Sequence, residues 1–128
     1  MPQKIDTKDA PAAIGPYSQA VLAPPFLFVS GQIPIDPKTG ALAADTIEDQ
    51  TQQVLANIEA ILKAAGLDFA DVVKTEVYLK DMQDFAAMNA LYAEAFRGPV
   101  LPARQAMQVA KLPRDVRVEI SCIAQLKT

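Results

Sequence analysis

Two charged side chains in the last quarter of the sequence could act together on a small ligand. Arg104 lies in the segment 102–109, and Glu119 lies in the segment 116–122. A guanidinium offers a planar fork of N–H groups that matches a carboxylate, and a glutamate can take a proton from water. If both side chains face the same way, they could hold a small carboxylate ligand and activate a water molecule beside it. The alternative is that both are solvated charges on an exposed sheet face.

Both segments alternate apolar and polar residues, which predicts two half-buried strands. In 102–109 we expect Met107 and Val109 to face the core, with Arg104 on the polar side. In 116–122 the residues expected to face the core are Val116, Val118, Ile120 and Cys122. We interpret Cys122 as a core residue, and we place Glu119 on the polar side of its strand.

A simple hairpin at residues 112–115 would pair the two strands. It would put Glu119 opposite Gln108 and Arg104 opposite Ile123. Arg104 and Glu119 would then lie roughly 13 Å apart along the strands, at about 3.3 Å per residue. A three- or four-carbon acid spans much less. We therefore expect the two residues of one site to come from neighbouring chains.

The rest of the chain predicts four more strands and two helices. Strands are expected at 4–5, 17–22, 26–30 and 73–79, and the apolar run 26–30 suits a buried central strand. One amphipathic helix is expected between the cap Thr46 and the stop Gly66, and a second between Asp81 and Gly98. Two helices can cover only one face of a sheet. The mixed polar residues left for the other face indicate a subunit interface: Lys74, Glu76, Tyr78, Arg104, Gln108, Arg117 and Glu119.

Composition narrows the functional classes. The 128 residues predict one domain, 1–128, and the absence of histidine excludes Ser-His-Asp catalysis, imidazole bases and histidine-rich zinc sites. A net charge of −3 without a basic run makes nucleic acid an improbable partner. No apolar run is long enough for a membrane span. With a single cysteine and no hydrophobic signal core at Met1, we expect a mature chain that starts here and a cytoplasmic protein.

Short motifs in a fixed order give the chain a resemblance to a known family. They are AAIGPY at 12–17, SGQIP at 30–34, DPKTG at 36–40, VKTEVYLKD at 73–81, PAR at 102–104 and VEI at 118–120. With them the chain resembles the YjgF/RidA family, also called the L-PSP endoribonuclease family, over essentially its full length. The resemblance implies an α+β fold of the chorismate-mutase-like type, with a mixed sheet of about six strands and two helices on one face. It also implies a homotrimer with three clefts between subunits.

The family's best-defined activity is the hydrolysis of 2-imino acids, which pyridoxal-phosphate-dependent dehydratases release. By position, the resemblance implies that Arg104 grips the substrate carboxylate, helped by the backbone N–H of Ala106. Some members carry cysteine where this chain has Ala106, so only the N–H function is expected there. Glu119 would hold and deprotonate the attacking water. No metal or cofactor is expected, because an imine carbon is already electrophilic.

Four further positions are expected around the same cleft. Tyr17 would close the pocket, and Gly31 would leave room for the substrate. Asn89 and Phe85 would shape the cleft. Taken alone, Tyr17 and Phe85 could be packed aromatics, and Asn89 could be helix surface.

Three functions remain open from the sequence. The first is an imine deaminase that protects pyridoxal-phosphate enzymes from 2-aminoacrylate. The second is an endoribonuclease that inhibits translation, and the third is a non-catalytic module that binds 2-keto acids. An Arg104 clamp would serve the first and the third equally.

Overall fold

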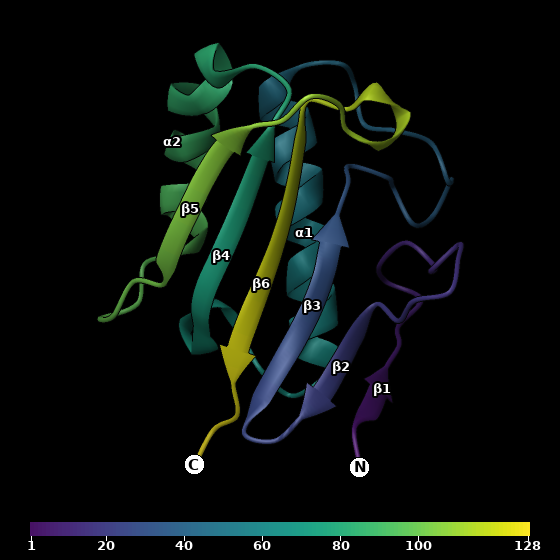
Figure 1. Cartoon of the computed structure of the whole chain (residues 1–128), viewed down its shortest axis with the longest axis vertical. Helices are drawn as coiled ribbons and strands as arrows, with labels where there is room; N and C mark the ends of the chain where they lie inside the picture. Colours follow the sequence, from purple (N-terminus) through teal and green to yellow (C-terminus); the bar gives the residue numbers. More distant parts are fainter.

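The computed structural model describes all 128 residues and consists of one six-stranded sheet with two helices on one face (Figure 1). The strands lie in the order β1-β2-β3-β6-β4-β5. Their bounds are β1 Gln3–Ile5, β2 Ala20–Ala23, β3 Phe26–Gln32, β4 Val72–Leu79, β5 Ala103–Gln108 and β6 Val118–Gln125. All neighbouring pairs are antiparallel except β4 and β5, which are parallel. The expected mixed α+β sheet and its two helices are confirmed.

The core lies between the sheet and the first helix, α1 (Ile47–Ala64). The Thr46 hydroxyl accepts the N–H of Asp49 at 3.1 Å, which caps the start of α1. The helix stops where Gly66 takes a positive φ of 76°, as the sequence predicted. Its apolar stripe packs against β3 and β6 through fully buried side chains, among them Val54, Ile58, Ile61 and Leu62. No helix of the structure is long and apolar enough to cross a membrane.

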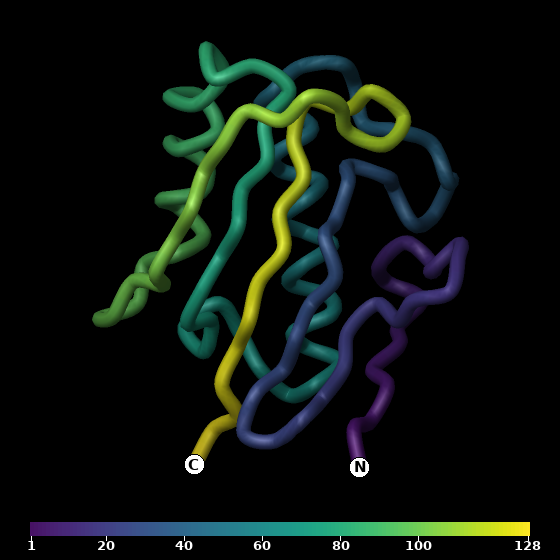
Figure 2. The backbone as a smooth tube through the Cα atoms, viewed as in Figure 1, coloured from purple at the N-terminus to yellow at the C-terminus, as the bar shows by residue number.

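The hairpin assumed between the last two strands does not form. β4 lies between β5 and β6, pairing with β5 in parallel and with β6 antiparallel. Figure 2 shows the segment after β5 passing over the end of β4 before β6 begins. In this register Glu119 lies opposite Tyr78, and Arg104 lies opposite Thr75. The physical reason is that the chain reaches β5 through a helix, and a strand–helix–strand connection places its two strands parallel.

The sheet face opposite the helices, called here the open face, is uncovered in the single chain. β3 alternates buried and exposed residues, so Leu27 and Val29 face the core while Phe26 and Phe28 lie on the open face. The prediction of a strand buried on both faces is therefore wrong for 26–30. Val73 is also exposed, because a register shift between β4 and β6 turns it out of the apolar set.

Two element boundaries also differ from prediction. The expected strand 17–22 begins only at Ala20, so Tyr17 lies in the loop before it. Asp81 caps a short 3-10 turn, Met82–Asp84, and the second helix, α2 (Phe85–Ala95), begins after that turn.

Candidate active site

Arg104 is held by three side chains of α2. Its Nη1 donates a hydrogen bond of 2.6 Å to Asn89 Oδ1. Its guanidinium carbon lies 5.3 Å from the centre of the Phe85 ring and 4.7 Å from the centre of the Tyr92 ring. Phe85, Asn89 and Tyr92 are spaced i, i+4 and i+7, which places them on one face of a helix. This group is called the guanidinium half-site.

The register of β5 explains why Arg104 faces α2. Arg104 pairs with Thr75 of β4, and the buried Thr75 hydroxyl contacts Tyr92 of α2, so this side of β5 faces the helices. Ala106 shares that side and packs on the core, while Met107 pairs with Tyr78 of the open face. The sequence placed Met107 toward the core and Arg104 on the polar side, and both placements are wrong. Val109, also expected in the core, follows the end of β5 and is half-buried.

The positive charge of Arg104 has no acidic partner. Arg104 takes part in none of the protein's ion pairs. Asn89 occupies one of its five N–H groups and leaves the others free. Such a guanidinium can receive a carboxylate through two charge-assisted hydrogen bonds.

The backbone beside Arg104 offers a further donor. Val109 donates its N–H to Leu79 of β4 at 3.0 Å. N–H groups of successive residues point to opposite edges of a strand, so the N–H of Ala106 points to the free edge of β5. Next to Arg104, a pocket of about 430 Å³ is lined by Asn89, Tyr92, Ala93, Phe96, Leu101, Pro102 and Arg104. Arg104, the free N–H and an apolar wall thus lie together at the sheet edge.

Glu119 lies in β6 with its side chain on the open face, next to Gly31 of β3. A Cβ added to Gly31 would overlap the Glu119 carboxylate. The sequence predicted that Gly31 leaves room for a ligand, but in the single chain this room holds Glu119. Burial raises the pKa of the Glu119 carboxyl. Tyr78, opposite it in β4, donates its hydroxyl to Glu76 at 2.6 Å and is not a donor to Glu119.

Tyr17 lies in a loop that is hydrogen-bonded to β3, the strand that carries Gly31. Its side chain is 52% exposed, and its loop is tied to β3 through Ser30. The Ser30 hydroxyl donates to the Ser18 carbonyl at 2.6 Å, and the Ser30 N–H donates to the Gln19 carbonyl at 2.9 Å. These bonds hold the Tyr17 loop beside the residue that precedes Gly31. Glu119, Gly31 and Tyr17 are called the carboxylate half-site.

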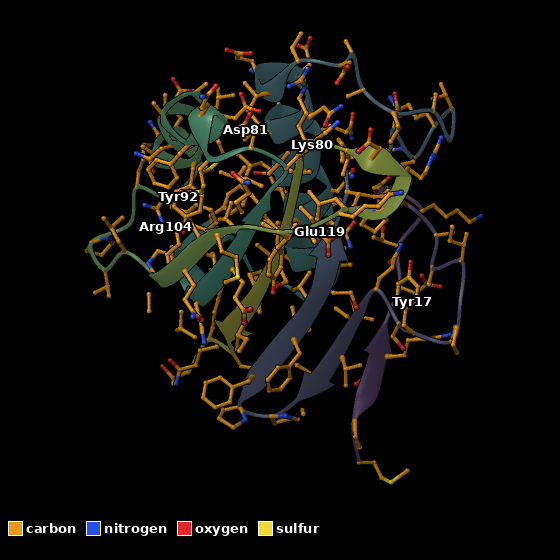
Figure 3. All side chains as sticks on the ribbon, turned by 45° about the horizontal axis from the view of Figure 1, so that its top comes forward. Tyr17, Lys80, Asp81, Tyr92, Arg104 and Glu119 are labelled. Atoms are coloured by element: carbon orange, nitrogen blue, oxygen red, sulfur yellow. The ribbon has the colours of Figure 1, made fainter.

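The two half-sites are separate within one chain. Figure 3 shows Arg104 and Tyr92 together at the β5 edge, Glu119 beside the end of β3 and Tyr17 beyond it. Glu119 is two strands away from β5 and level with Met107, three residues beyond Arg104. Strand spacings of about 4.8 Å and rises of about 3.3 Å put the Cα atoms of Arg104 and Glu119 roughly 14 Å apart. Their side chains also leave opposite faces of the sheet, so the prediction that they face the same way is wrong for one chain.

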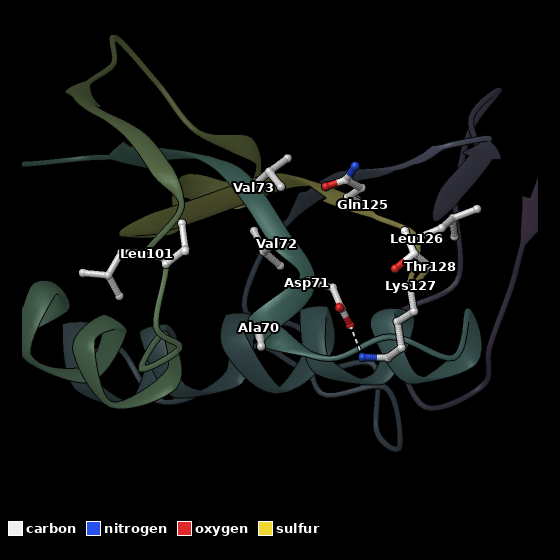
Figure 4. A pocket seen from close by; sticks show the side chains of 10 residues that line it. Ala70, Asp71, Val72, Val73, Leu101, Gln125, Leu126, Lys127 and Thr128 are labelled. Atoms are coloured by element: carbon white, nitrogen blue, oxygen red, sulfur yellow. Dashed lines mark ion pairs between the residues drawn. The ribbon is translucent and has the colours of Figure 1, made fainter.

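A second pocket lies at the start of β4 and contains neither Arg104 nor Glu119. It has a volume of about 440 Å³ and is lined by apolar side chains, with an ion pair of 2.8 Å between Lys127 and Asp71 (Figure 4). The ion pair neutralises the one cation of the pocket. Cys122 is buried in the core, as expected, and burial raises the pKa of its thiol to about 12. Neither place offers a free charge or a thiolate.

Tyr92 and Thr75 are the site residues that the sequence analysis missed. The sequence indicates Tyr92 as part of the apolar stripe of the second helix and Thr75 as part of one face of its strand, and it gave neither residue a role in the site. The spacing of Phe85, Asn89 and Tyr92 was visible in the sequence. That stripe faces Arg104 only because β5 is the parallel neighbour of β4.

The fold and the site together define a six-stranded α+β domain with an uncompensated guanidinium at the edge of its sheet. The family model described as Endoribonuclease L-PSP matches residues 7–126. The chain belongs to this family.

Relatives and a solved structure agree with this assignment. RutC family protein PH0854 of Pyrococcus horikoshii is 59% identical over 97% of this chain and 98% of its own. A 2-iminobutanoate/2-iminopropanoate deaminase of Salmonella typhimurium is 50% identical over 97% of this chain and 98% of its own. The crystal structure of E. coli TdcF with bound serine superimposes with a TM-score of 0.93 at 42% identity, covering 98% of this chain and 99% of that one. Other relatives carry different names, such as the putative regulator AldR of Lactococcus lactis, which is 49% identical over 97% of this chain and 98% of its own.

The contact between Gly31 and Glu119 generates a prediction. Gly31→Ala should push the Glu119 carboxylate out of its partly desolvated position, so the raised pKa of Glu119 should fall toward its ordinary value. Carbon-13 NMR titration of the glutamate carboxyls measures this directly. Gly98→Ala is the matched control, since a Cβ there meets only ordinary contacts at 3.6 Å or more. An unchanged Glu119 pKa in folded Gly31→Ala would show that Gly31 does not set the position of the carboxylate.

Proposed function

We propose that this protein is an imine deaminase, which hydrolyses reactive 2-imino acids such as 2-iminopropanoate and 2-iminobutanoate to 2-keto acids and ammonia. The observation that carries the proposal is the Arg104 guanidinium, which is fixed by Asn89 and two aromatic rings and has no acidic partner. A cation held in this way is suited to a ligand carboxylate. The 50% identity to a named 2-iminobutanoate/2-iminopropanoate deaminase supports the choice of ligand.

The reaction needs little chemical machinery. Arg104, aided by the N–H of Ala106, holds the carboxylate and fixes the C=N group in place. Glu119 takes a proton from water as the water oxygen bonds to the imine carbon, and the proton then passes to the nitrogen. The resulting carbinolamine loses ammonia and leaves the 2-keto acid. A site with one guanidinium and one carboxylate is sufficient for water addition to an electrophilic carbon.

The proposed active unit is a homotrimer whose three clefts lie between subunits. The two half-sites of one chain are roughly 14 Å apart and on opposite faces of the sheet. The guanidinium half-site of one chain beside the carboxylate half-site of the next would bring Arg104 and Glu119 onto one ligand. The open face carries exposed Phe26 and Phe28, which suit burial against another subunit. Three identical clefts follow from threefold closure of one such contact.

We place this activity in the cytoplasm, downstream of pyridoxal-phosphate dehydratases that release unstable imino acids. The test is ammonia release from 2-iminobutanoate generated in the assay by a threonine dehydratase. Acceleration over the spontaneous rate supports the deaminase. Binding of 2-oxobutanoate without acceleration would instead identify a 2-keto-acid-binding module. RNA cleavage that is lost in folded Arg104 or Glu119 variants would favour a ribonuclease.

The first of three predictions from this proposal concerns the guanidinium. Arg104→Lys should lower kcat/KM for imine hydrolysis by about 10- to 100-fold, because lysine is a point charge without the planar fork that grips a carboxylate. The variant should keep its fold, since Arg104 is exposed. Arg97→Lys, an exposed arginine of the same chain without an ion pair, should leave the rate unchanged. Wild-type turnover in Arg104→Lys would remove the carboxylate-clamp role.

The second prediction concerns pH. The Glu119 carboxyl must be ionised to accept a proton, and burial raises its pKa. The enzymatic rate should therefore fall as the pH drops through a pKa above that of an ordinary glutamate. Glu119→Gln should lose this limb of the pH profile and reduce turnover by about 100-fold or more, while still binding 2-oxobutanoate. Exposed Glu94→Gln is the control; an active Glu119→Gln variant would leave Glu119 a structural role only.

The third prediction concerns the shared cleft. Inactive Arg104→Ala and inactive Glu119→Gln proteins, unfolded together and refolded, should regain part of the wild-type activity. Mixed trimers would contain some clefts in which both intact residues meet. Native mass spectrometry confirms the mixing. Mixed trimers with no activity would place Arg104 and Glu119 of each cleft in one chain.

A further inference from the structure

The Tyr92 ring packs against the Arg104 guanidinium, and the Tyr92 hydroxyl is held in the protein interior. The guanidinium carbon of Arg104 lies 4.7 Å from the centre of the Tyr92 ring. The Tyr92 hydroxyl lies 2.7 Å from Thr75 Oγ1 in the interior, and Thr75 is fully buried. One tyrosine therefore joins the exposed guanidinium to a buried hydroxyl.

These three residues form a closed arrangement across two strands and a helix. Thr75 of β4 and Arg104 of β5 are direct partners in the parallel pair. Tyr92 of α2 contacts both of them, one through its hydroxyl and the other through its ring face. The Tyr92 ring also packs against the Phe96 ring, with centroids 4.4 Å apart. A ring held at its hydroxyl and packed on Phe96 cannot turn away from the guanidinium without leaving a buried hydroxyl unpaired.

An arginine on an edge strand needs such support. Its side chain is exposed and has several rotatable bonds, so without contacts it would sample many orientations. A carboxylate clamp requires the fork in one orientation. Asn89 holds one N–H group, and the rings of Phe85 and Tyr92 add two further contacts to the guanidinium.

We infer that Tyr92, anchored by Thr75, is a positioning residue that holds the Arg104 guanidinium in the orientation that receives a carboxylate ligand. This inference rests on the proposed function for the identity of the ligand. Tyr92 itself packs against the guanidinium and takes no part in proton transfer. The competing explanation is that Tyr92 is an ordinary core residue whose loss lowers stability and nothing else.

The test follows Arg104 itself as well as ligand binding. In ¹⁵N-labelled protein, the Nε–H resonance of Arg104, assigned by its absence in Arg104→Lys, should carry a ring-current shift. In Tyr92→Leu this shift should shrink, and the Kd for 2-oxobutanoate should rise about 10-fold. Met88→Val is the control: it alters a fully buried residue of α2 that is neither a hydrogen-bond partner nor a ring partner of Arg104, so it should lower Tm without moving the resonance or the Kd.

A second variant separates the anchor from the ring and covers the case in which Tyr92→Leu does not fold. Tyr92→Phe combined with Thr75→Val removes both buried hydroxyls while keeping the shapes, so stability should stay close to wild type. The Arg104 resonance should keep a ring-current shift but show greater mobility, and the Kd should rise a few-fold. Wild-type resonance, mobility and Kd in this double variant, or in folded Tyr92→Leu, would overturn the inference. If 2-oxobutanoate fails to bind the wild type, the proposed function falls, and the resonance alone decides the role of Tyr92.

Discussion

The parallel pairing of β4 and β5 is the constraint on which the rest of the site depends. It places Arg104 beside Thr75 and turns both toward α2, where Asn89 and two aromatic rings receive the guanidinium. It also leaves β5 at the edge of the sheet, with the Ala106 N–H unpaired by any strand of the same chain. In an antiparallel hairpin with β6, neither the contact with α2 nor the free edge would follow. The site at Arg104 is therefore a consequence of strand order more than of the residues immediately around it.

The sequence predicted the elements whose periodicity is strong. The stripe from Ile47 to Leu62 and the cap at Thr46 define α1, and the alternation in Val118–Cys122 defines the inner face of β6. Strand order is a different kind of information. The succession of strand 73–79, helix and strand 102–109 is typical of a β-α-β unit, and this signal for a parallel pair was available. A hairpin across the short Leu112–Asp115 link conflicts with that unit. Once β5 is wrongly paired, Arg104 is assigned to the wrong face.

Contacts between distant segments account for the other differences. Gly31 was expected to leave space, but only the pairing of β3 with β6 shows that the space receives the Glu119 carboxylate. Tyr17 was identified as a site residue from a motif, whereas its position depends on the bonds of Ser30 to the loop. Tyr92 fits a buried helix stripe in the sequence, and its second contact appears only when Arg104 is placed above it. Residue types can indicate which residues belong to a site. The residues that those side chains contact depend on the register of strands far apart in the chain.

The two half-sites carry opposite charges, and neither charge has an ionic partner within its own chain. Burial raises the pKa of the Glu119 carboxyl, and Glu119 takes part in no ion pair of its own chain. Arg104 is a cation without an acid beside it, held by neutral groups alone. An ion pair between them in one chain would satisfy both charges and occupy the fork that a ligand carboxylate needs. Neutral support by Asn89, Phe85 and Tyr92 avoids this, because it fixes the guanidinium without competing for its charge. In the assembly proposed above, the ligand carboxylate would meet Arg104 while Glu119 of the adjacent chain faces the water, so each charge would act on the substrate and not on the other.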